Sequence, residues 1–234
     1  DFPQVQTAFL VLWIGGIVSA ILLHGMRTPF CAVAVPTYMA SLIFCLSFPN
    51  PTMTLFTALF LAIVKVGICM SVCLHRYAAH AAFKCSESVR FVIMWLGCLA
   101  NQGGPIWWAS QHRCHHKYCD VARDPHSQTV DGVERAFAFF EVHNEVNEEF
   151  APKHCDTVPL RILDTWSFVP IWMELLLADK LGGPKGLFIH YVGSWLCQTV
   201  TLWFNLANHP ILTSSTDKNK CTAQDDKGPL LVYY

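Results

Sequence analysis

The sequence predicts an all-α, polytopic membrane protein built from helices, with a histidine-rich region on its cytoplasmic side. Three observations support this fold class: an apolar composition, long apolar runs that recur along the chain, and histidines that gather just after two of these runs. Of the 234 residues, 53% are hydrophobic and only 14% are charged, and the mean hydropathy is +0.35. The net charge of −1 gives no sign of nucleic-acid binding.

Apolar runs lie at 7–24, 31–48, 53–74, 89–100, 162–178 and 187–208. Several approach or exceed the roughly 18–20 residues that a helix needs to cross a bilayer. We therefore expect an N-terminal apolar helix within residues 1–30 and a separate helical domain over residues 31–234. The run at 89–100 is too short to cross and should lie in the interface or re-enter the same face. Gly182-Gly183-Pro184 should join the last two runs into a helical hairpin.

The polar part of the chain, residues 75–161, carries nine of the sixteen lysines and arginines, which indicates a cytoplasmic location by the positive-inside tendency. Both histidine clusters described below fall in this part. The chain has eleven cysteines but no Cys-x-x-Cys pair, so structural zinc is not indicated. Many of the cysteines lie within or beside apolar runs, and we expect them to be reduced thiols that behave as small hydrophobic side chains.

Two histidine clusters follow apolar runs: His75 and His80, then His112, His115 and His116. Imidazole is a common ligand of first-row metals, and an all-nitrogen set suits iron, copper or zinc better than magnesium or calcium. On an α-helix the second cluster shares one face and can converge on one point. The first pair is about 140° apart around an ideal helix, so both can face one metal only if the helix ends between them. The alternative is a polar rim of surface imidazoles.

Polar residues also occur within the last apolar run. Asn205 and His209 are four residues apart, so they share one helical face at the cytoplasmic end of that run. A metal site is one interpretation, and an interhelical hydrogen-bond cluster that includes Asn208 is the other. Asp120 and Asp124 follow the second histidine cluster, and either could accept a hydrogen bond from a metal-bound imidazole or simply cap a turn.

Three other histidines are not expected to bind the metal directly. His126 and His143 lie near the proposed chemistry but outside both clusters. His154 falls in a polar segment and should be solvated.

The pattern of these residues resembles the membrane fatty acid desaturases, most nearly the stearoyl-CoA (delta-nine) type, from about residue 31 to the C-terminus. The resemblance is carried by His75-Arg76-Tyr77 with His80, Gln111-His112-Arg113-Cys114-His115-His116-Lys117-Tyr118, Asp124-Pro125-His126-Ser127 and the pair Asn205 and His209. It implies oxygen-dependent desaturation of a long-chain fatty acyl substrate at a diiron centre. It also implies an electron donor, either a b-type cytochrome or a ferredoxin, and a location in a lipid-synthesising membrane, the endoplasmic reticulum in a eukaryote.

The resemblance also implies the roles of individual residues. Two iron ions would be held by His75, His80, His112, His115, His116 and His209, with Asn205 holding a water on one of them. An unactivated methylene has no acidic proton and no leaving group, so acid–base or nucleophilic catalysis cannot begin the reaction. A redox metal with dioxygen can. The protein must then supply a dry acyl tunnel, whose wall we expect from Gln102, Trp107 and Trp108. The alternative for the tryptophans is an interfacial aromatic belt.

The sequence departs from the family pattern at two places. A third histidine segment is expected some 15–20 residues after Asp225-Asp226, which makes the desaturase domain incomplete at Tyr234. Ser110-Gln111 stands where an animal acyl-CoA desaturase has Arg-Asp, which leaves lipid-linked or acyl-carrier substrates open. Two alternatives remain: a membrane diiron hydroxylase of alkyl, sterol or ceramide substrates, and a non-catalytic lipid-binding membrane protein that lacks the third segment.

Overall fold

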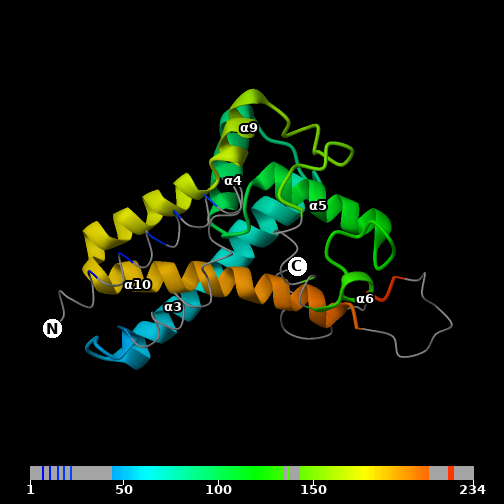
Figure 1. Ribbon diagram of the computed structural model, residues 1–234. Helices are drawn as coiled ribbons and strands as arrows, with labels where there is room; N and C mark the ends of the chain where they lie inside the picture. Colours follow the sequence, from blue (N-terminus) through cyan, green and yellow to red (C-terminus); the bar gives the residue numbers. More distant parts are fainter. Residues whose placement is uncertain are drawn as a thin grey trace.

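The computed structural model describes residues 44–133, 136, 143–210 and 221–223, together with the single residues 7, 11, 15, 18 and 22. Within these residues the structure is helical and contains no strand, as the sequence predicts (Figure 1). The elements are α3 (Pro51–Lys65), the π-helix η1 (Val66–Ala79), α4 (Glu87–Cys98), α5 (Pro105–Tyr118), α6 (Gln128–Asp131), α9 (Val158–Thr165) and α10 (Phe168–Asn208). Most of the run at 31–48, and all but five residues of the helix expected within residues 1–30, lie outside the described residues.

Helices α3 and η1 form one continuous helix over Pro51–Ala79, 29 residues long. Pro51 begins it at a position where the missing N–H costs nothing. Phe56, Phe60 and Ile68 are among its exposed apolar side chains. Among the described residues, this helix is long and apolar enough to cross a membrane by length and composition.

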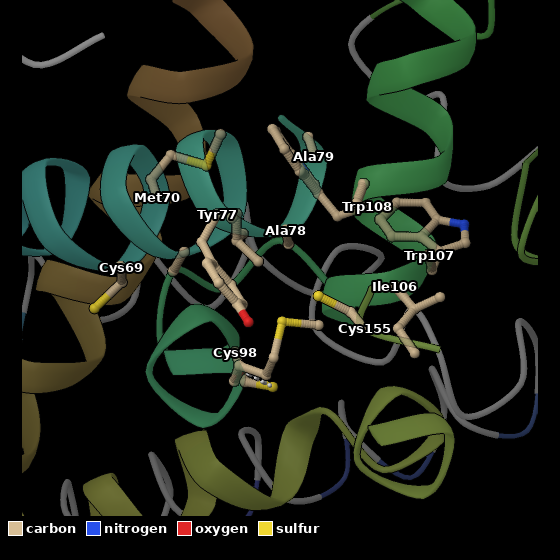
Figure 2. Close-up of a cluster of buried hydrophobic side chains, with 14 of the residues drawn as sticks. Cys69, Met70, Tyr77, Ala78, Ala79, Cys98, Ile106, Trp107, Trp108 and Cys155 are labelled. Atoms are coloured by element: carbon tan, nitrogen blue, oxygen red, sulfur yellow. Dashed lines mark hydrogen bonds between the residues drawn. The ribbon is translucent and has the colours of Figure 1, made fainter. Parts of the chain in front are cut away.

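A core of apolar side chains joins η1 to α4 and α5. Figure 2 shows Met70 and Tyr77 from η1, Cys98 from α4, and Ile106 and Trp107 from α5 gathered in this core. All five side chains are almost completely buried. Burying such side chains stabilises the fold by roughly 1.5–3 kcal/mol each. The core therefore fixes α5, which carries the second histidine cluster, against the end of η1, which carries the first.

The N-terminus of α5 is anchored by a buried carboxylate from α9. Asp164 Oδ1 accepts hydrogen bonds from the backbone N–H groups of Ile106 at 2.8 Å and Trp107 at 2.9 Å. An anion at this position satisfies N–H groups that the helix leaves unpaired and interacts favourably with its dipole. Gly104 lies directly beneath Asp164, so close that a Cβ at this position would be 2.6 Å from the Asp164 backbone oxygen. The contact explains why glycine precedes this helix.

Helix α10 is a hairpin of two arms, seen in yellow and orange in Figure 1. The chain reverses at Gly183, whose φ of 58° lies in the left-handed region, and Pro184 cannot donate a backbone hydrogen bond to the preceding turn. The expected hairpin is therefore present. Its first arm begins at Phe168 and not at residue 162, because α9 ends at Thr165. The orange arm packs along α3.

A buried ion pair links α3 to both arms of α10. Lys65, which is 3% exposed, donates to Glu174 Oε2 at 2.6 Å, to Ser194 Oγ at 2.7 Å and to the Leu99 carbonyl at 3.2 Å. An ammonium group has three N–H donors, and each finds an acceptor. The other carboxylate oxygen, Glu174 Oε1, lies 2.7 Å from His190 Nδ1.

Replacing Lys65 by methionine should lower the free energy of unfolding by about 3–5 kcal/mol, because Glu174 would remain buried without its counter-charge. The double variant Lys65→Met with Glu174→Gln should recover much of this loss, since no buried charge is left unpaired. Denaturant unfolding of the detergent-solubilised full-length protein measures both. A loss below 1 kcal/mol for the single variant would show that the pair is not structurally important.

Candidate metal centre

The first histidine pair is brought together by the unusual winding of η1. In a π-helix the N–H of residue i+5 bonds to the carbonyl of residue i, so residues five apart lie only about 50° from one another around the axis, against about 140° in an α-helix. The N–H of His80 bonds to the His75 carbonyl at 3.1 Å, and the two ring centroids are 4.6 Å apart. The helix does end between the two histidines, at Ala79. It is the π winding up to that point that aligns them.

Helix α5 adds His112 and His116 to this pair. His112 Nε2 lies 3.2 Å from His80 Nε2 and 3.0 Å from His116 Nε2. We call His75, His80, His112 and His116 the first set; one ring nitrogen from each lies within 4.8 Å of every other. Neighbouring nitrogens on one ion, each bonded at about 2.0–2.1 Å, lie roughly 3 Å apart. The donor type and spacing of the first set therefore fit a transition-metal ion.

His115 does not join the first set, so the expectation that all three histidines of α5 converge on one point is wrong. Around the helix axis His116 lies about 40° from His112, whereas His115 lies about 60° away on the other side. Its ring stacks on His126 with centroids 4.2 Å apart and lies 4.8 Å from the His209 ring. We call His115, His126 and His209 the second set.

Two buried aspartates orient the second set. Both carboxylate oxygens of Asp124 lie 2.9 Å from His115 Nδ1, and Asp120 Oδ2 lies 2.9 Å from His209 Nδ1. A carboxylate that accepts the Nδ1 proton of an imidazole fixes the tautomer and directs Nε2 toward a metal. The structure thus places both aspartates where the sequence suggested that they could act. Beside them, the Asn205 side-chain amide is 2.6 Å from His126 Nδ1.

The protonation states of these groups suit a metal. Burial, followed by neighbouring histidines, lowers the pKa of His112 well below its usual value and that of His116 to about 4. Burial also lowers the pKa of His126 to about 3. For Asp120, burial opposes the charge, but hydrogen bonds from His209, Thr222 and Ser127 lower the pKa to about 2. These imidazoles are neutral and this carboxylate is charged at neutral pH, the states that metal binding requires.

A cavity of about 240 Å³ lies beside both sets. Its wall includes apolar side chains, Met70, Leu202 and Phe204 among them, and also Gln102 and Trp108. The Trp108 ring stacks on His112 with centroids 4.7 Å apart.

Gln102, Trp107 and Trp108 were expected to form this wall, and the prediction for Trp107 is wrong. Adjacent helical residues point about 100° apart, so Trp107 points away from Trp108 and into the core. Its indole N–H donates to the His143 carbonyl at 2.6 Å.

Sequence reasoning missed one functional candidate near the centre and misplaced another histidine. His126 is buried and forms part of a group that could hold a metal with His115 and Asp124; its place in Asp-Pro-His-Ser was the only available signal. His154 is not solvated as expected, because it is half-buried and donates to the Tyr77 carbonyl at 2.9 Å. It ties the loop before α9 to the end of η1.

The expectation of uniformly reduced cysteines is also wrong. Cys119 and Cys221 form a disulfide across 102 residues of sequence, next to Asp120. The other eight cysteines in the described part of the chain are free, and all but Cys85 are buried. Two cysteines this far apart in the sequence form no local motif, so the spacing of the cysteines did not predict this pair.

Comparisons with known proteins place these observations in context. The chain is 50% identical over 140 residues to a hex-5-enoyl-[acyl-carrier protein] acetylenase of Moorena producens (strain JHB), a match that covers 54% of this chain and 42% of that protein. It is also 36% identical over 101 residues to a chloroplastic palmitoyl-monogalactosyldiacylglycerol delta-7 desaturase of Arabidopsis thaliana, covering 43% of this chain and 26% of that protein. The chain is similar to fatty acid desaturases.

A third relative, delta-9 acyl-lipid desaturase 2 of Arabidopsis thaliana, is 44% identical over 71 residues, which cover 30% of this chain and 22% of that protein. The chain thus spans less than half the length of each of these relatives. Their names give different acyl carriers and bond positions, so the similarity supports fatty acyl desaturation in general and does not single out the stearoyl-CoA type. No family model and no solved structure matches the chain.

Proposed function

We propose that the full-length protein is a membrane-bound fatty acyl desaturase of the diiron type, with delta-nine chemistry as the expected bond position. The observation that carries the proposal is the convergence of six histidines from η1, α5 and the end of α10, two of them held by buried aspartates, beside a cavity with apolar walls. The similarity to named desaturases supports the same reaction.

The two histidine sets suggest how two iron ions would be held. His75, His80, His112 and His116 would ligate one ion, and His115 and His209 the other, with a water on the second ion held by Asn205. This assignment leaves each ion room for further donors. His126, which stacks on His115, would keep that ring in place. Asp124 and Asp120 would hold the Nδ1 protons, so that Nε2 is the ligating atom.

The chain's own residues would prepare the substrate for the reaction. Bound iron would supply the oxygen-dependent redox chemistry that an unactivated methylene requires. Met70, Leu202 and Trp108 would hold the acyl chain in the cavity and exclude water from it. Trp108 stacks on His112. This contact would fix the position of the acyl chain relative to an iron ligand.

The carrier of the acyl group is proposed to be a lipid or an acyl-carrier protein. Ser110 is fully buried and accepts a hydrogen bond from the Asn147 N–H at 3.0 Å. Gln111 donates to the Glu145 carbonyl at 2.9 Å. Both side chains hold the 143–150 loop and offer no positive charge to a coenzyme A phosphate. The names of the three relatives described above specify acyl-carrier-protein or lipid substrates, whereas two other relatives are named as acyl-CoA desaturases, so the carrier proposal rests on Ser110 and Gln111 and not on the names. None of these names favours the hydroxylase or the non-catalytic alternative.

The proposed topology is polytopic, with both histidine clusters on the cytoplasmic face of a lipid-synthesising membrane. Pro51–Ala79 would cross the bilayer, and the two arms of α10 would cross and return. Helix α4, with 12 residues and a length of about 18 Å, is too short to cross a hydrocarbon core of about 30 Å. A b-type cytochrome or a ferredoxin would approach from the cytoplasm to deliver electrons.

Cysteines introduced at Lys84 and Lys117, in a background without the other exposed thiols, should both react with an impermeant reagent added from the cytoplasmic side. The two positions flank α4, which is expected to stay on one face. Lys117 is exposed at the end of α5 and Lys84 is exposed before α4, so both thiols would be accessible. Modification of only one position would contradict the topology.

Expression of the full-length protein in a desaturase-deficient host tests the function itself. We expect a new monounsaturated fatty acid in the lipid extract, identified with its bond position by mass spectrometry. The His112→Ala variant should yield none at the same membrane abundance. A hydroxylated product, or no product from a well-expressed protein, would contradict the proposal.

A further inference from the structure

Four hydrogen bonds converge on the Asp120 carboxylate. Besides His209 Nδ1 at 2.9 Å, Asp120 Oδ2 accepts the backbone N–H and the hydroxyl of Thr222, each at 2.8 Å. Asp120 Oδ1 accepts the Ser127 hydroxyl at 2.7 Å. The Asp120 side chain is 1% exposed. Two of the four donors that orient this carboxylate toward His209 therefore come from Thr222.

Thr222 reaches Asp120 through a covalent connection. Cys221, the residue before Thr222, is bonded to Cys119, the residue before Asp120, and their Cα atoms are 5.0 Å apart. The disulfide thus places the 221–223 segment directly against Asp120. Cys119 Sγ also lies 3.8 Å from His209 Nδ1, so the disulfide adjoins the same imidazole.

We propose that the Cys119–Cys221 disulfide is a redox-controlled tie and that Thr222 is a positioning residue for His209. The proposal rests on the proposed function, in which His209 ligates iron. While the disulfide is intact, Thr222 fixes the Asp120 carboxylate, and Asp120 holds the His209 ring with Nε2 directed at the metal. When the disulfide is reduced, the covalent bond that holds the 221–223 segment against Asp120 is lost, the hydrogen bonds from Thr222 to Asp120 weaken, and His209 is held less firmly. Iron binding at the second set then weakens.

The reductant is a dithiol. Its thiolate attacks Cys221, which is solvent-exposed, and the Cys119–Cys221 bond breaks as a mixed disulfide forms. The second thiol of the reductant then attacks the mixed disulfide. Two electrons and two protons pass to the chain, which gains two thiols, and the dithiol becomes a disulfide. Disulfides on a cytoplasmic face are commonly redox-sensing. Cys221 is exposed whereas Cys119 is half-buried, so Cys221 is the accessible partner.

The test is anaerobic Fe(II) binding by the full-length protein, oxidised or reduced with a phosphine, which offers no thiol ligand. Peptide mass spectrometry reports the state of the disulfide. The reduced protein and the Cys119→Ser/Cys221→Ser variant should bind one of two irons about tenfold more weakly, the size of effect typical when a group behind a ligand is lost. Thr222→Val should weaken the binding of the same ion by the oxidised protein, because the hydroxyl donor is lost. Thr222→Ser keeps that hydroxyl and should bind the ion with wild-type affinity.

Three results would overturn the inference. One is equal affinity in both redox states from a protein that binds two irons and forms product, which would leave the proposed function intact. Another is tight Zn²⁺ binding on reduction, since Cys119, Asp120, His209 and Cys221 offer atoms within 4.8 Å of one another; these residues would then form a separate metal site. Failure to bind iron in either state would overturn the proposed function and this inference with it.

Discussion

Replacing His115 by alanine is expected to abolish desaturation and to lower iron affinity at the second set at least about 100-fold. His115 lies between the groups of that set: Asp124 holds its Nδ1, His126 stacks on its ring, and the His209 ring is 4.8 Å away. Removing a ligand costs more than the 10–100-fold that is typical for a group behind a ligand. Iron titration of the purified full-length variant measures the affinity, and the fatty acid profile of cells that express it measures desaturation.

The variant should remain in the membrane, because apolar partition and helix packing would hold the segments that we propose to span it. Lys117→Ala, two residues further along α5 and exposed, is the matched control and should keep normal iron content and product. Normal product from the His115 variant would rule out the diiron assignment.

Replacing Gly104 by alanine is expected to lower the free energy of unfolding by about 2–4 kcal/mol, from overpacking and the loss of a helix cap. The new Cβ would overlap the Asp164 carboxylate, which holds the first N–H groups of α5. Displacing α5 by even an ångström would separate His112 from the η1 histidines, so activity should fall with stability. Thermal unfolding and product analysis of the same preparations test this.

Gly182→Ala is the control for that substitution, since nothing lies within 4 Å of a Cβ at Gly182 and its φ is not positive. It should leave stability and activity within the scatter of the wild-type protein. A Gly104 variant with wild-type stability would mean that Asp164 does not anchor α5.

Composition and spacing predicted much of this structure. Apolar runs indicated helices, and a Gly-Gly-Pro break indicated the reversal that occurs at Gly183. The i, i+4 spacing brought His112 and His116 together because α5 is an ordinary α-helix. Asp120 and Asp124 were predicted as partners of ligand histidines because they closely follow the second cluster and metal-bound imidazoles commonly donate to carboxylates.

Other features depended on tertiary structure. The helix end predicted between His75 and His80 is present at Ala79, but the π winding over Val66–Ala79, which also aligns the two histidines, has no signature in a hydropathy pattern. The position of His126 against His115 depends on how the 119–127 turn folds. Cys119 and Cys221 are bonded across 102 residues of sequence, at a place where the end of α10 brings His209 next to Cys119. Such contacts between distant segments follow from packing and not from local spacing.

Iron-edge anomalous scattering from crystals of the iron-loaded full-length protein tests the central claim most directly. The account predicts two separate peaks, one among His75, His80, His112 and His116, and one beside His115 and His209. A single peak, or a peak between Cys119 and Cys221 with none in the first set, would contradict it.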